Sequence, residues 1–190
     1  MAWITWGDVV DVSHKINSRG WRYLAAKLRL SSQKRVQATW DAAGNAVANW
    51  WHIPAVKARW NKKVTGDPDV PYEAYLAQHY LSPRPQGRVL SIGCGNGSHE
   101  IKLAQQPGVT HVTGIDLAPK KIAEANETAQ SLGLTNTTFL SGDLFTHDLG
   151  QQAYDVVLFN SSLHHFHQLE TILQGKVPEW LTADGLLVLF

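Results

Sequence analysis

The chain has 190 residues, of which 44% are hydrophobic and 17% charged, and its formal net charge is +1. This length suits one ordinary domain, or a small domain with an extension, and the composition disfavours intrinsically disordered and coiled-coil proteins. No apolar run approaches membrane-spanning length, and the N-terminus lacks the basic start and apolar stretch of a signal peptide. We therefore expect a globular, cytoplasmic protein, and the single cysteine, Cys94, fits a reducing compartment.

The two parts of the chain differ in charge. Residues 1–65 contain eleven Lys or Arg and three Asp, a balance of +8, so the remaining residues carry −7. Two interpretations of the basic part stay open. In the first, the basic part contacts a phosphate group, an acidic substrate or, weakly and peripherally, an anionic membrane surface. In the second, it forms a solvated face that docks against the acidic part of the chain.

Helical spacing predicts amphipathic helices near the N-terminus. Trp21, Leu24, Ala25 and Leu28 recur at i, i+3, i+4 and i+7, and a second apolar segment covers residues 40–51. These segments are rich in tryptophan, which more often packs in a core or between domains than against a cofactor.

Pro54, at a first-turn position, predicts a helix toward Thr65 that the turn at residues 66–69 ends. A short helix is predicted over residues 72–81, followed by a Pro- and Gly-containing linker. We therefore expect an N-terminal helical extension over residues 1–81.

Strands and helices alternate over residues 86–190, which we expect to form the second domain. The continuous apolar strands predict a parallel sheet covered by helices on both faces, an α/β fold. Strands are predicted over 89–92, 111–115, 137–140, 154–159 and 186–190, and helices over 98–106, from Pro119 to Gly133 and within 169–180. The expected apolar stripe of the helix from Pro119 is Ile122, Ala125, Ala129 and Leu132.

The stretch RVLSIGCGNGS places Gly93, Gly95 and Gly97 between a strand and a helix. Glycine permits left-handed backbone and close approach of a ligand, and amides at the start of a helix can face a polar or negative group. Asp116 follows the second strand about 20 residues later, where a carboxylate can accept hydrogen bonds from ribose hydroxyls. A cap on the following helix is the alternative role for Asp116.

Nicotinamide-dependent dehydrogenases use the same two features, so the spacing of the glycines matters. Their pattern is G-x-G-x-x-G, whereas this run is G-C-G-N-G-S-H, with Ser98 in place of the third glycine. A nicotinamide oxidoreductase is therefore disfavoured.

Five motifs, in order and spacing, carry a resemblance: VLSIGCGNG, VTGIDLAPKKI, LSGDLF, YDVVLFNSSLHH and LTADGLLVLF. Over residues 86–190 the chain resembles the class I S-adenosylmethionine-dependent methyltransferases, which implies a Rossmann-like doubly wound sheet and S-adenosyl-L-methionine as the cofactor. The sheet of that family has seven strands, and the last apolar strand here matches the fifth. We expect a fragment lacking the C-terminal part of the fold, and the alternative is that a partner chain, as in an oligomer, covers the exposed final strand.

The resemblance also implies roles for individual residues. The glycines would lie beneath the methionine part of the cofactor, Asp116 would hold the ribose hydroxyls, and Asn160 would lie beside the sulfonium. A turn role for Asp143 and a strand-end cap for Asn160 are the alternatives. The implied cofactor-binding residues are Gly93, Gly95, Gly97, Asp116, Leu117, Gly142, Asp143, Leu144 and Asn160.

One position departs from the family pattern. The family has an acid just after the first strand, as in VLDIGCG, and this chain has Ser91 there. A hydroxyl offers no charge to the methionine ammonium group. Glu100, one turn into the next helix, is the candidate to supply charge nearby, and a place on the helix surface is its alternative.

Methyl transfer is an in-line displacement that gains from holding the acceptor close and aligned. Where a base is needed, His164 and His165 are the candidate catalytic residues, since a neutral imidazole can take a proton near pH 7, and a structural role is the alternative. With His167 they form a cluster that lacks Cys or carboxylate partners, so no metal site is expected. Cys94 is expected to act as a small apolar filler.

The acceptor is less defined. Asn160-Ser161-Ser162-Leu163 differs from the Asn-Pro-Pro-Tyr motif of base amino-group methylases, so nucleic acid is disfavoured. Residues 50–67 resemble the helical extension of some bacterial small-molecule or glycan methyltransferases, which implies such an acceptor. We expect Trp60, Tyr72 or Tyr75 to help roof the cofactor, with interdomain packing as the alternative. The alternative function is a non-catalytic nucleoside-binding module whose basic, Trp-rich region docks on a membrane surface or a protein.

Overall fold

The computed structural model describes residues 9–10, 13–14, 16–17, 37, 53–84 and 86–190. The chain divides into two compact units between Val47 and Ala48, and the second unit, Ala48–Phe190, contains the elements described below. The helices expected near Trp21 and over residues 40–51 lie outside the described residues. In the described part of the chain, no helix is long and apolar enough to cross a membrane.

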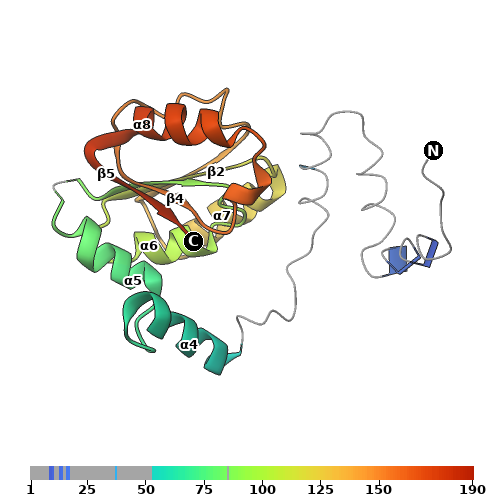
Figure 1. Ribbon diagram of the computed structural model, residues 1–190, viewed down its shortest axis with the longest axis horizontal. Helices are drawn as coiled ribbons and strands as arrows, with labels where there is room; N and C mark the ends of the chain where they lie inside the picture. Colours follow the sequence, from blue (N-terminus) through green and yellow to red (C-terminus); the bar gives the residue numbers. More distant parts are fainter. Residues whose placement is uncertain (1–8, 11–12, 15, 18–36, 38–52, 85) are drawn as a thin grey trace. The chain divides into compact units, whose positions relative to one another are not determined.

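Five parallel strands form one sheet in the order β3-β2-β1-β4-β5 (Figure 1). The order runs outward from β1 in both directions, which is the arrangement of a doubly wound α/β sheet, so the predicted fold class is confirmed. The reversal of chain order falls between β1 and β4, and ligands of such sheets bind outside the carboxyl ends of the strands at this point. The strands are β1 (Arg88–Ile92), β2 (His111–Asp116), β3 (Thr137–Ser141), β4 (Tyr154–Phe159) and β5 (Leu181–Leu189).

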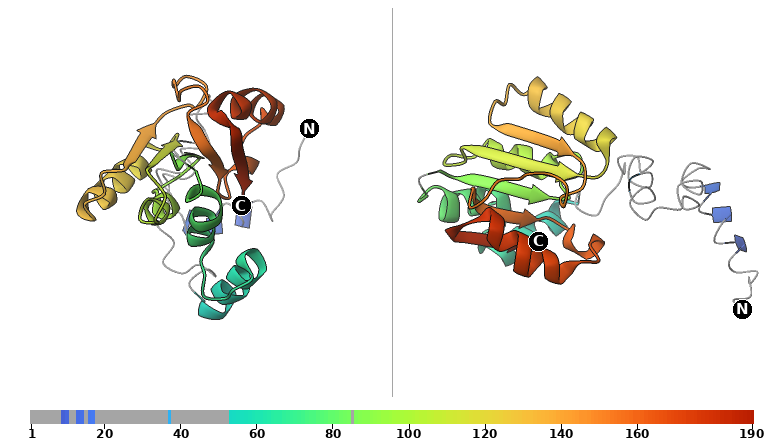
Figure 2. Two further views of the ribbon diagram at one scale, coloured as in Figure 1. Left: turned by 90° about the vertical axis from the view of Figure 1, so that its left-hand side faces the viewer. Right: turned by 90° about the horizontal axis from the view of Figure 1, so that it is seen from above.

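Helices cover both faces of the sheet (Figure 2). One face carries α5, α6 and α7, and the other carries α8 with the π-helix that precedes it (Figure 1). The helical elements are α4 (Pro54–Thr65), α5 (Tyr72–Leu76) with its π-helical continuation (Ala77–Leu81), α6 (Ser98–Ala104), α7 (Pro119–Ser131), a 3₁₀ turn (Leu163–His165), a second π-helix (Thr171–Lys176) and α8 (Val177–Trp180).

Alternation along β1 divides the core between the two faces. Leu90 and Ile92 pack in a buried cluster with Trp180 of α8, and Val89 packs in the cluster on the opposite face. Because successive strand side chains alternate, Ser91 faces the same side as Val89, toward α6. Ser91 is therefore a polar side chain inserted, at 1% exposure, into an apolar face of the central strand.

The last strand is longer and less regular than predicted. β5 begins at Leu181, opposite Tyr154, and returns to register at Leu186, opposite Val156. The residues between them, which include Asp184 and Gly185, form a bulge within the strand. β5 lies at the edge of the sheet (Figure 1), and its pairing with another chain stays a prediction.

The stripe of α7 is confirmed in part. Ile122, Ala125 and Ala129 are buried, but Leu132 is 52% exposed, so its assignment to the stripe was wrong. The helix ends at Ser131, and Leu132 is already in the C-cap position, where the side chain no longer follows the helical face.

The helices before the linker pack on the sheet. Leu76, Ala77 and Leu81 are buried in one cluster with Val89 and other sheet residues. The expected domain boundary between residues 81 and 86 therefore does not coincide with the division into compact units, which lies near residue 47. Leu76, Ala77 and Leu81 thus share a core with sheet residues, and the division into an extension over residues 1–81 and a second domain from residue 86 stays a prediction.

Arg84, in this connection, holds the amino-terminal edge of the sheet. Its Nε donates to the carbonyl of Tyr80 at 2.9 Å, and its Nη2 donates to the carbonyl of Asp184 in the β5 bulge. Its Nη1 lies 3.8 Å from the carboxylate of Asp155 on β4, which also accepts the N–H of Arg88 at 2.9 Å.

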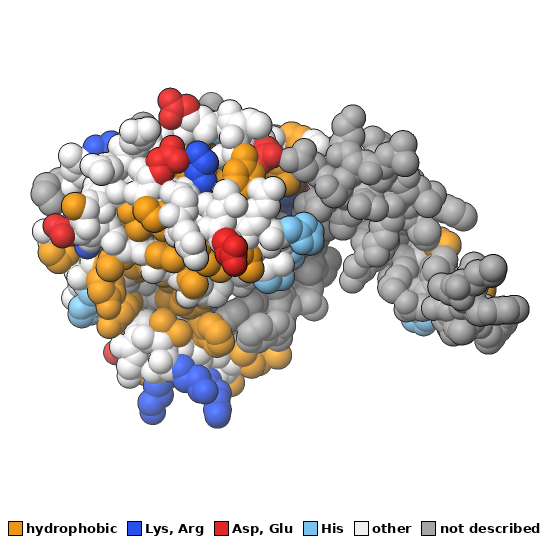
Figure 3. Space-filling model, turned by 45° about the horizontal axis from the view of Figure 1, so that its top comes forward, with side chains coloured by type: hydrophobic (Ala, Val, Ile, Leu, Met, Phe, Trp, Pro, Cys, Tyr) orange, Lys and Arg blue, Asp and Glu red, His pale blue; other side chains and the backbone are white. Residues whose placement is uncertain are grey.

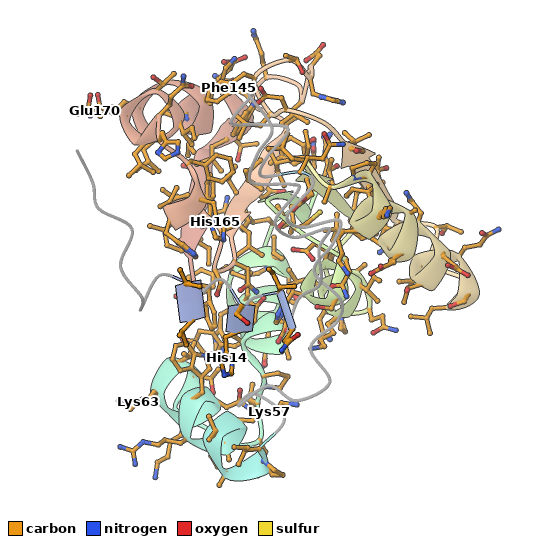
Figure 4. All side chains as sticks on the ribbon, turned by 90° about the vertical axis from the view of Figure 1, so that its right-hand side faces the viewer. His14, Lys57, Lys63, Phe145, His165 and Glu170 are labelled. Atoms are coloured by element: carbon orange, nitrogen blue, oxygen red, sulfur yellow. The ribbon has the colours of Figure 1, made fainter. Side chains whose placement is uncertain are left out.

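Helix α4 carries the described part of the basic region. It has no acidic residue in its first turn, and its Lys and Arg side chains are exposed to solvent (Figures 3 and 4). The exposed basic residues are Lys57, Arg59, Lys62 and Lys63. Both interpretations of this region, an anionic partner or a solvated face, stay predictions.

We expect Gly97→Ala to lower the free energy of unfolding by about 2 to 4 kcal/mol, because strain and overpacking combine. Gly97 has φ +70°, and a Cβ there would lie 2.7 Å from the ring of Phe139 and 2.9 Å from the Cβ of Ala125. Gly95→Ala is the matched control: it has φ +56° but meets nothing within 4 Å, so only about 1 to 2 kcal/mol of backbone strain applies. Urea unfolding of both variants measures the difference, and equal losses would contradict this account.

Candidate functional site

The loop after β1 has the left-handed backbone that its glycines permit. Gly93, Gly95 and Gly97 have φ of +73°, +56° and +70°. The loop is fastened to the end of β2, since the N–H groups of Gly93 and Cys94 donate to the carbonyl of Ile115 at 2.8 and 3.2 Å. Side chains other than glycine rarely adopt this conformation, so the alternating glycines are required by the path of the loop itself.

Asp116, the last residue of β2, joins this loop to the start of α7. Its Oδ2 accepts the N–H of Gly95 at 2.9 Å, and its Oδ1 accepts the N–H of Ala118 at 2.8 Å. The second bond closes an Asx turn ahead of α7, whose N-cap residue is Ala118 and which has no side-chain cap bond, so the alternative role as a helix cap is not seen. A carboxylate offers about four acceptor positions, so two bonds leave capacity for further donors.

The β3 end contributes a turn. The N–H of Gly142 donates to the carbonyl of Asp116 at 2.9 Å, which brings this turn beside the β2 end, where Leu117 is half-buried. Asp143 accepts the N–H of Phe145 at 3.1 Å, as the turn interpretation expects. Leu144, which the resemblance implies to contact the cofactor, is 4% exposed and packs in the core cluster, and its contact with the cofactor stays a prediction.

The end of β4 meets the β1 loop. Ser161 has φ +51°, and after this turn the hydroxyl of Ser162 donates to the carbonyl of Ile92 at 2.5 Å. A Cβ on Gly93 would lie 2.7 Å from the Cβ of Ser162, so the two loops approach too closely for a side chain there.

Asn160, also at the β4 end, contacts α5. Its Nδ2 donates to the phenol oxygen of Tyr72 at 2.6 Å. The ring of Tyr72 stacks on that of Phe190, with centroids 4.0 Å apart. Trp60 contacts the Phe190 ring edge-on, with centroids 5.6 Å apart. Of the aromatic residues expected near the site, Tyr72 thus contacts a site residue directly, whereas Tyr75 pairs with aromatic side chains of its own helix.

His164 and His165 lie exposed in the 3₁₀ turn after β4, with ring centroids 3.9 Å apart. Figure 4 labels His165. Partial burial and the neighbouring His164 lower the pKa of His165, while the carboxylate of Asp116 acts in the opposite direction. The turn follows the end of β4, so His165 lies at the same edge of the sheet as Asp116, and its lowered pKa leaves the imidazole neutral at neutral pH.

The structure decides between the alternatives for Glu100. This side chain is 1% exposed, and its Oε1 accepts the hydroxyl of Ser91 at 2.6 Å, so it does not lie on the helix surface. A signal for this burial exists in the sequence: Glu100 lies three and four positions before Leu103 and Ala104, on the apolar face of α6.

Cys94 behaves as a filler of this loop. Gly114, on β2, leaves the space that Cys94 occupies, since a Cβ there would lie 2.8 Å from the Sγ atom. Burial, followed by the charges of Glu100 and Asp116, raises the pKa of the thiol well above its ordinary value, which keeps it unreactive. Among the described residues, no group of three or more His, Cys, Asp or Glu is arranged to hold a metal ion.

Comparison with known proteins identifies the domain. Residues 83–189 match the family model described as a methyltransferase domain. A (S)-tetrahydroprotoberberine N-methyltransferase from Eschscholzia californica is 29% identical over 99 residues, which cover 52% of this chain and 28% of that protein. A 23S rRNA (uracil(1939)-C(5))-methyltransferase from Shewanella sp. (strain ANA-3) is 37% identical over 68 residues, covering 36% of this chain and 15% of that protein. The chain thus spans less than a third of the length of these relatives.

A solved structure shares the fold. The crystal structure of a SAM-dependent methyltransferase from Aquifex aeolicus superposes with a TM-score of 0.53 at 17% identity, covering 71% of each chain. Together with the family match, which takes in more than half of the residues, the sheet order and the glycine loop agree with the resemblance found in the sequence. The chain belongs to the class I S-adenosylmethionine-dependent methyltransferases.

Proposed function

We propose that this chain binds S-adenosylmethionine at the carboxyl edge of its sheet and transfers the methyl group to an oxygen or nitrogen of a small-molecule or glycan acceptor. The observation that carries the proposal is the carboxylate of Asp116. It holds the left-handed Gly95 and the start of α7 in place while keeping acceptor positions for hydroxyl donors.

The residues at this edge fit the chemistry of the cofactor. A Cβ on Gly95 would meet nothing within 4 Å, so a ligand can approach the backbone there. Asp116 suits ribose hydroxyls, and Glu100 has a buried oxygen without a partner among the described residues, which suits a cationic donor. Gly95 thus suits close approach of the sulfonium part, Asp116 suits the sugar and Glu100 suits the amino-acid part of one molecule.

S-adenosylmethionine, when bound, supplies a methyl group activated by the positive sulfur. The chain's own part is to position the acceptor and to accept a proton. Asn160, held by Tyr72, would line the space between the cofactor and the acceptor. His165, neutral at neutral pH and near Asp116, would take the proton from the attacking oxygen or nitrogen, with His164 beside it.

The acceptor class rests on two supports. The aromatic rings of Tyr72, Phe190 and Trp60 gather next to Asn160 and give that side of the site an apolar character. Relatives that match this domain include a methyltransferase named for nitrogen of a plant alkaloid, and also one named for C5 of a ribosomal uracil. The absence of an Asn-Pro-Pro-Tyr motif after β4 disfavours the amino group of a nucleic-acid base as the acceptor.

A test of the acceptor class uses tritiated S-adenosylmethionine with fractionated cell extract. We expect label in the small-molecule or glycan fraction. Label confined to RNA would overturn the acceptor class. Tight S-adenosylhomocysteine binding without label in any fraction would favour the non-catalytic binding module.

Replacing Asp116 tests the binding mode. We expect Asp116→Ala to weaken S-adenosylhomocysteine binding by about 1 to 3 kcal/mol, because hydrogen bonds to a charged group are lost. Glu124→Ala, which removes an exposed carboxylate of α7, serves as the control. Calorimetry measures both variants once circular dichroism shows that they fold. Unchanged affinity in folded Asp116→Ala, or tight binding of a nicotinamide dinucleotide instead, would refute the assignment.

The pH dependence tests His165. Because its pKa lies below the ordinary value of 6.5, protonation removes the base only as the pH falls below that value, so methyl transfer should stay constant from neutral pH down to this range and then decline. We expect His165→Ala to slow transfer by about 100-fold and to abolish this decline. S-adenosylhomocysteine affinity should stay within about twofold of the wild type. An unchanged rate would assign His165 a structural role.

A further inference from the structure

Glu100 is a buried carboxyl group with one oxygen unused. The side chain is 1% exposed, and its Oε1 accepts the hydroxyl of Ser91 at 2.6 Å. Its Oε2 has no hydrogen-bond partner among the described residues. Burying an acid in this way is costly unless a partner arrives, so the position calls for an explanation beyond packing.

The location of this group ties it to the candidate site. Ser91 lies on β1 two residues before the glycine loop, on the face covered by α6. Glu100 and Asp116 both raise the pKa of Cys94, within that loop, so the two carboxyl groups approach the same loop. The unused oxygen therefore lies within electrostatic reach of the segment over which a ligand would bind.

The neighbouring basic side chains, His99 and Lys102, contact another acid, Glu73. Glu73 of α5, 4% exposed, accepts a hydrogen bond from Nδ1 of His99 at 2.8 Å and lies 3.7 Å from the ammonium group of Lys102. Burial alone would raise the pKa of Glu73, but the His99 hydrogen bond and these charges bring it below its ordinary value. Two buried acids lie close together, and the contacts of His99 and Lys102 go to Glu73.

The electrostatics of Glu100 differ from those of its neighbour. Burial raises its pKa, the Ser91 hydrogen bond and His99 act in the opposite direction, and Glu73 adds to the rise. The groups that face it are Glu73 and Tyr72 from α5, His99 from α6 and Cys94 from the loop. A cation beside Oε2 would offset the burial and favour the ionised form.

We propose that Glu100 receives the ammonium group of the methionine part of S-adenosylmethionine, while Ser91 positions the carboxyl by holding its other oxygen. This inference rests on the proposed function. An ammonium group supplies both the positive charge and the N–H donors that Oε2 lacks. The carboxylate that contacts the ammonium group is therefore that of Glu100 on α6, and the hydroxyl of Ser91 on β1 holds it in place.

Tyr72 lies near this carboxyl group. Its ring is 7% exposed, stacks on Phe190 and lies near enough to Glu100 for the two groups to influence each other's ionisation. Among the described residues it has one hydrogen bond, the one from Asn160 at 2.6 Å.

The test compares two ligands by calorimetry: S-adenosylhomocysteine and its deaminated analogue, which carries hydrogen in place of the ammonium group. We expect Glu100→Gln to weaken S-adenosylhomocysteine binding by about tenfold or more, because a charge-assisted hydrogen bond is lost. Binding of the deaminated analogue should change by less than about twofold, since that ligand offers no cation to position 100.

Glu73→Gln is the matched control, because it removes the same charge from a buried carboxyl whose partners are already present. We expect it to leave the preference for S-adenosylhomocysteine over the deaminated analogue unchanged. The double variant Ser91→Asp with Glu100→Gln returns a carboxyl to the strand and should restore most of this preference. A general loss of stability would lower the affinity for both ligands alike.

Proton release gives a second readout. Free Glu100 has a raised pKa and holds a proton more tightly than an exposed acid, and the bound ammonium group favours its ionised form. Binding of S-adenosylhomocysteine should therefore release protons below the raised pKa, and its affinity should increase with pH up to that value. The observed binding enthalpy of the wild type will then vary with the ionisation enthalpy of the buffer, and that of Glu100→Gln will not.

The outcomes separate the two proposals. If the wild type binds neither ligand, the proposed function fails. If it binds both, and Glu100→Gln loses no more affinity for S-adenosylhomocysteine than for the deaminated analogue, only the assignment of Glu100 is overturned. An equal loss of preference in Glu73→Gln would likewise overturn it, since the acidic surroundings rather than Glu100 would then recognise the cation.

Discussion

The carboxylate of Asp116 is the contact on which the edge of the sheet depends. Two backbone N–H groups, one in the loop after β1 and one at the start of α7, donate to its two oxygens. Both groups belong to segments that leave the sheet, and the N–H groups of Gly93 and Cys94 also fasten the loop to the end of β2. Since β1 and β2 are parallel neighbours, one side chain at the end of β2 can reach both segments. The loop therefore has its left-handed shape before any ligand arrives, which reduces the ordering that binding would require.

A second set of contacts brings distant parts of the chain to the same edge. Ser162, after β4, donates to the carbonyl of Ile92 at the end of β1, and Asn160 donates to Tyr72 on α5. Helix α5 lies before the first strand in the sequence, yet its residues are buried in the same cluster as sheet residues. The edge is thus built from the ends of β1, β2 and β4 together with a helix that precedes all of them, and α5 is a component of the site as well as of the core.

Much of this arrangement could be predicted from local sequence pattern. The strands were recognisable because they are short, apolar and bounded by turn residues, and the glycines marked a loop whose φ angles proved left-handed. Other features depend on contacts between distant residues. The burial of Leu144 in the core and the hydrogen bond between Asn160 and Tyr72, 88 positions apart, follow from how the elements pack. Glu100 is intermediate: its helical spacing indicated a buried face, but a charged residue in that position is ordinarily assigned to the surface.

The position of Arg84 bears on which substitutions the candidate site can tolerate. Its guanidinium group connects the segment after α5 to β4 and to the β5 bulge, at the amino-terminal edge of the sheet. The candidate site lies at the other end of the same strands. The contacts of Arg84 and the residues of the candidate site are thus separated by the length of a strand. Substitutions at this anchor therefore leave the loop after β1 and the carboxylate of Asp116 in place, whereas substitutions in α5 reach the site through the hydrogen bond between Tyr72 and Asn160.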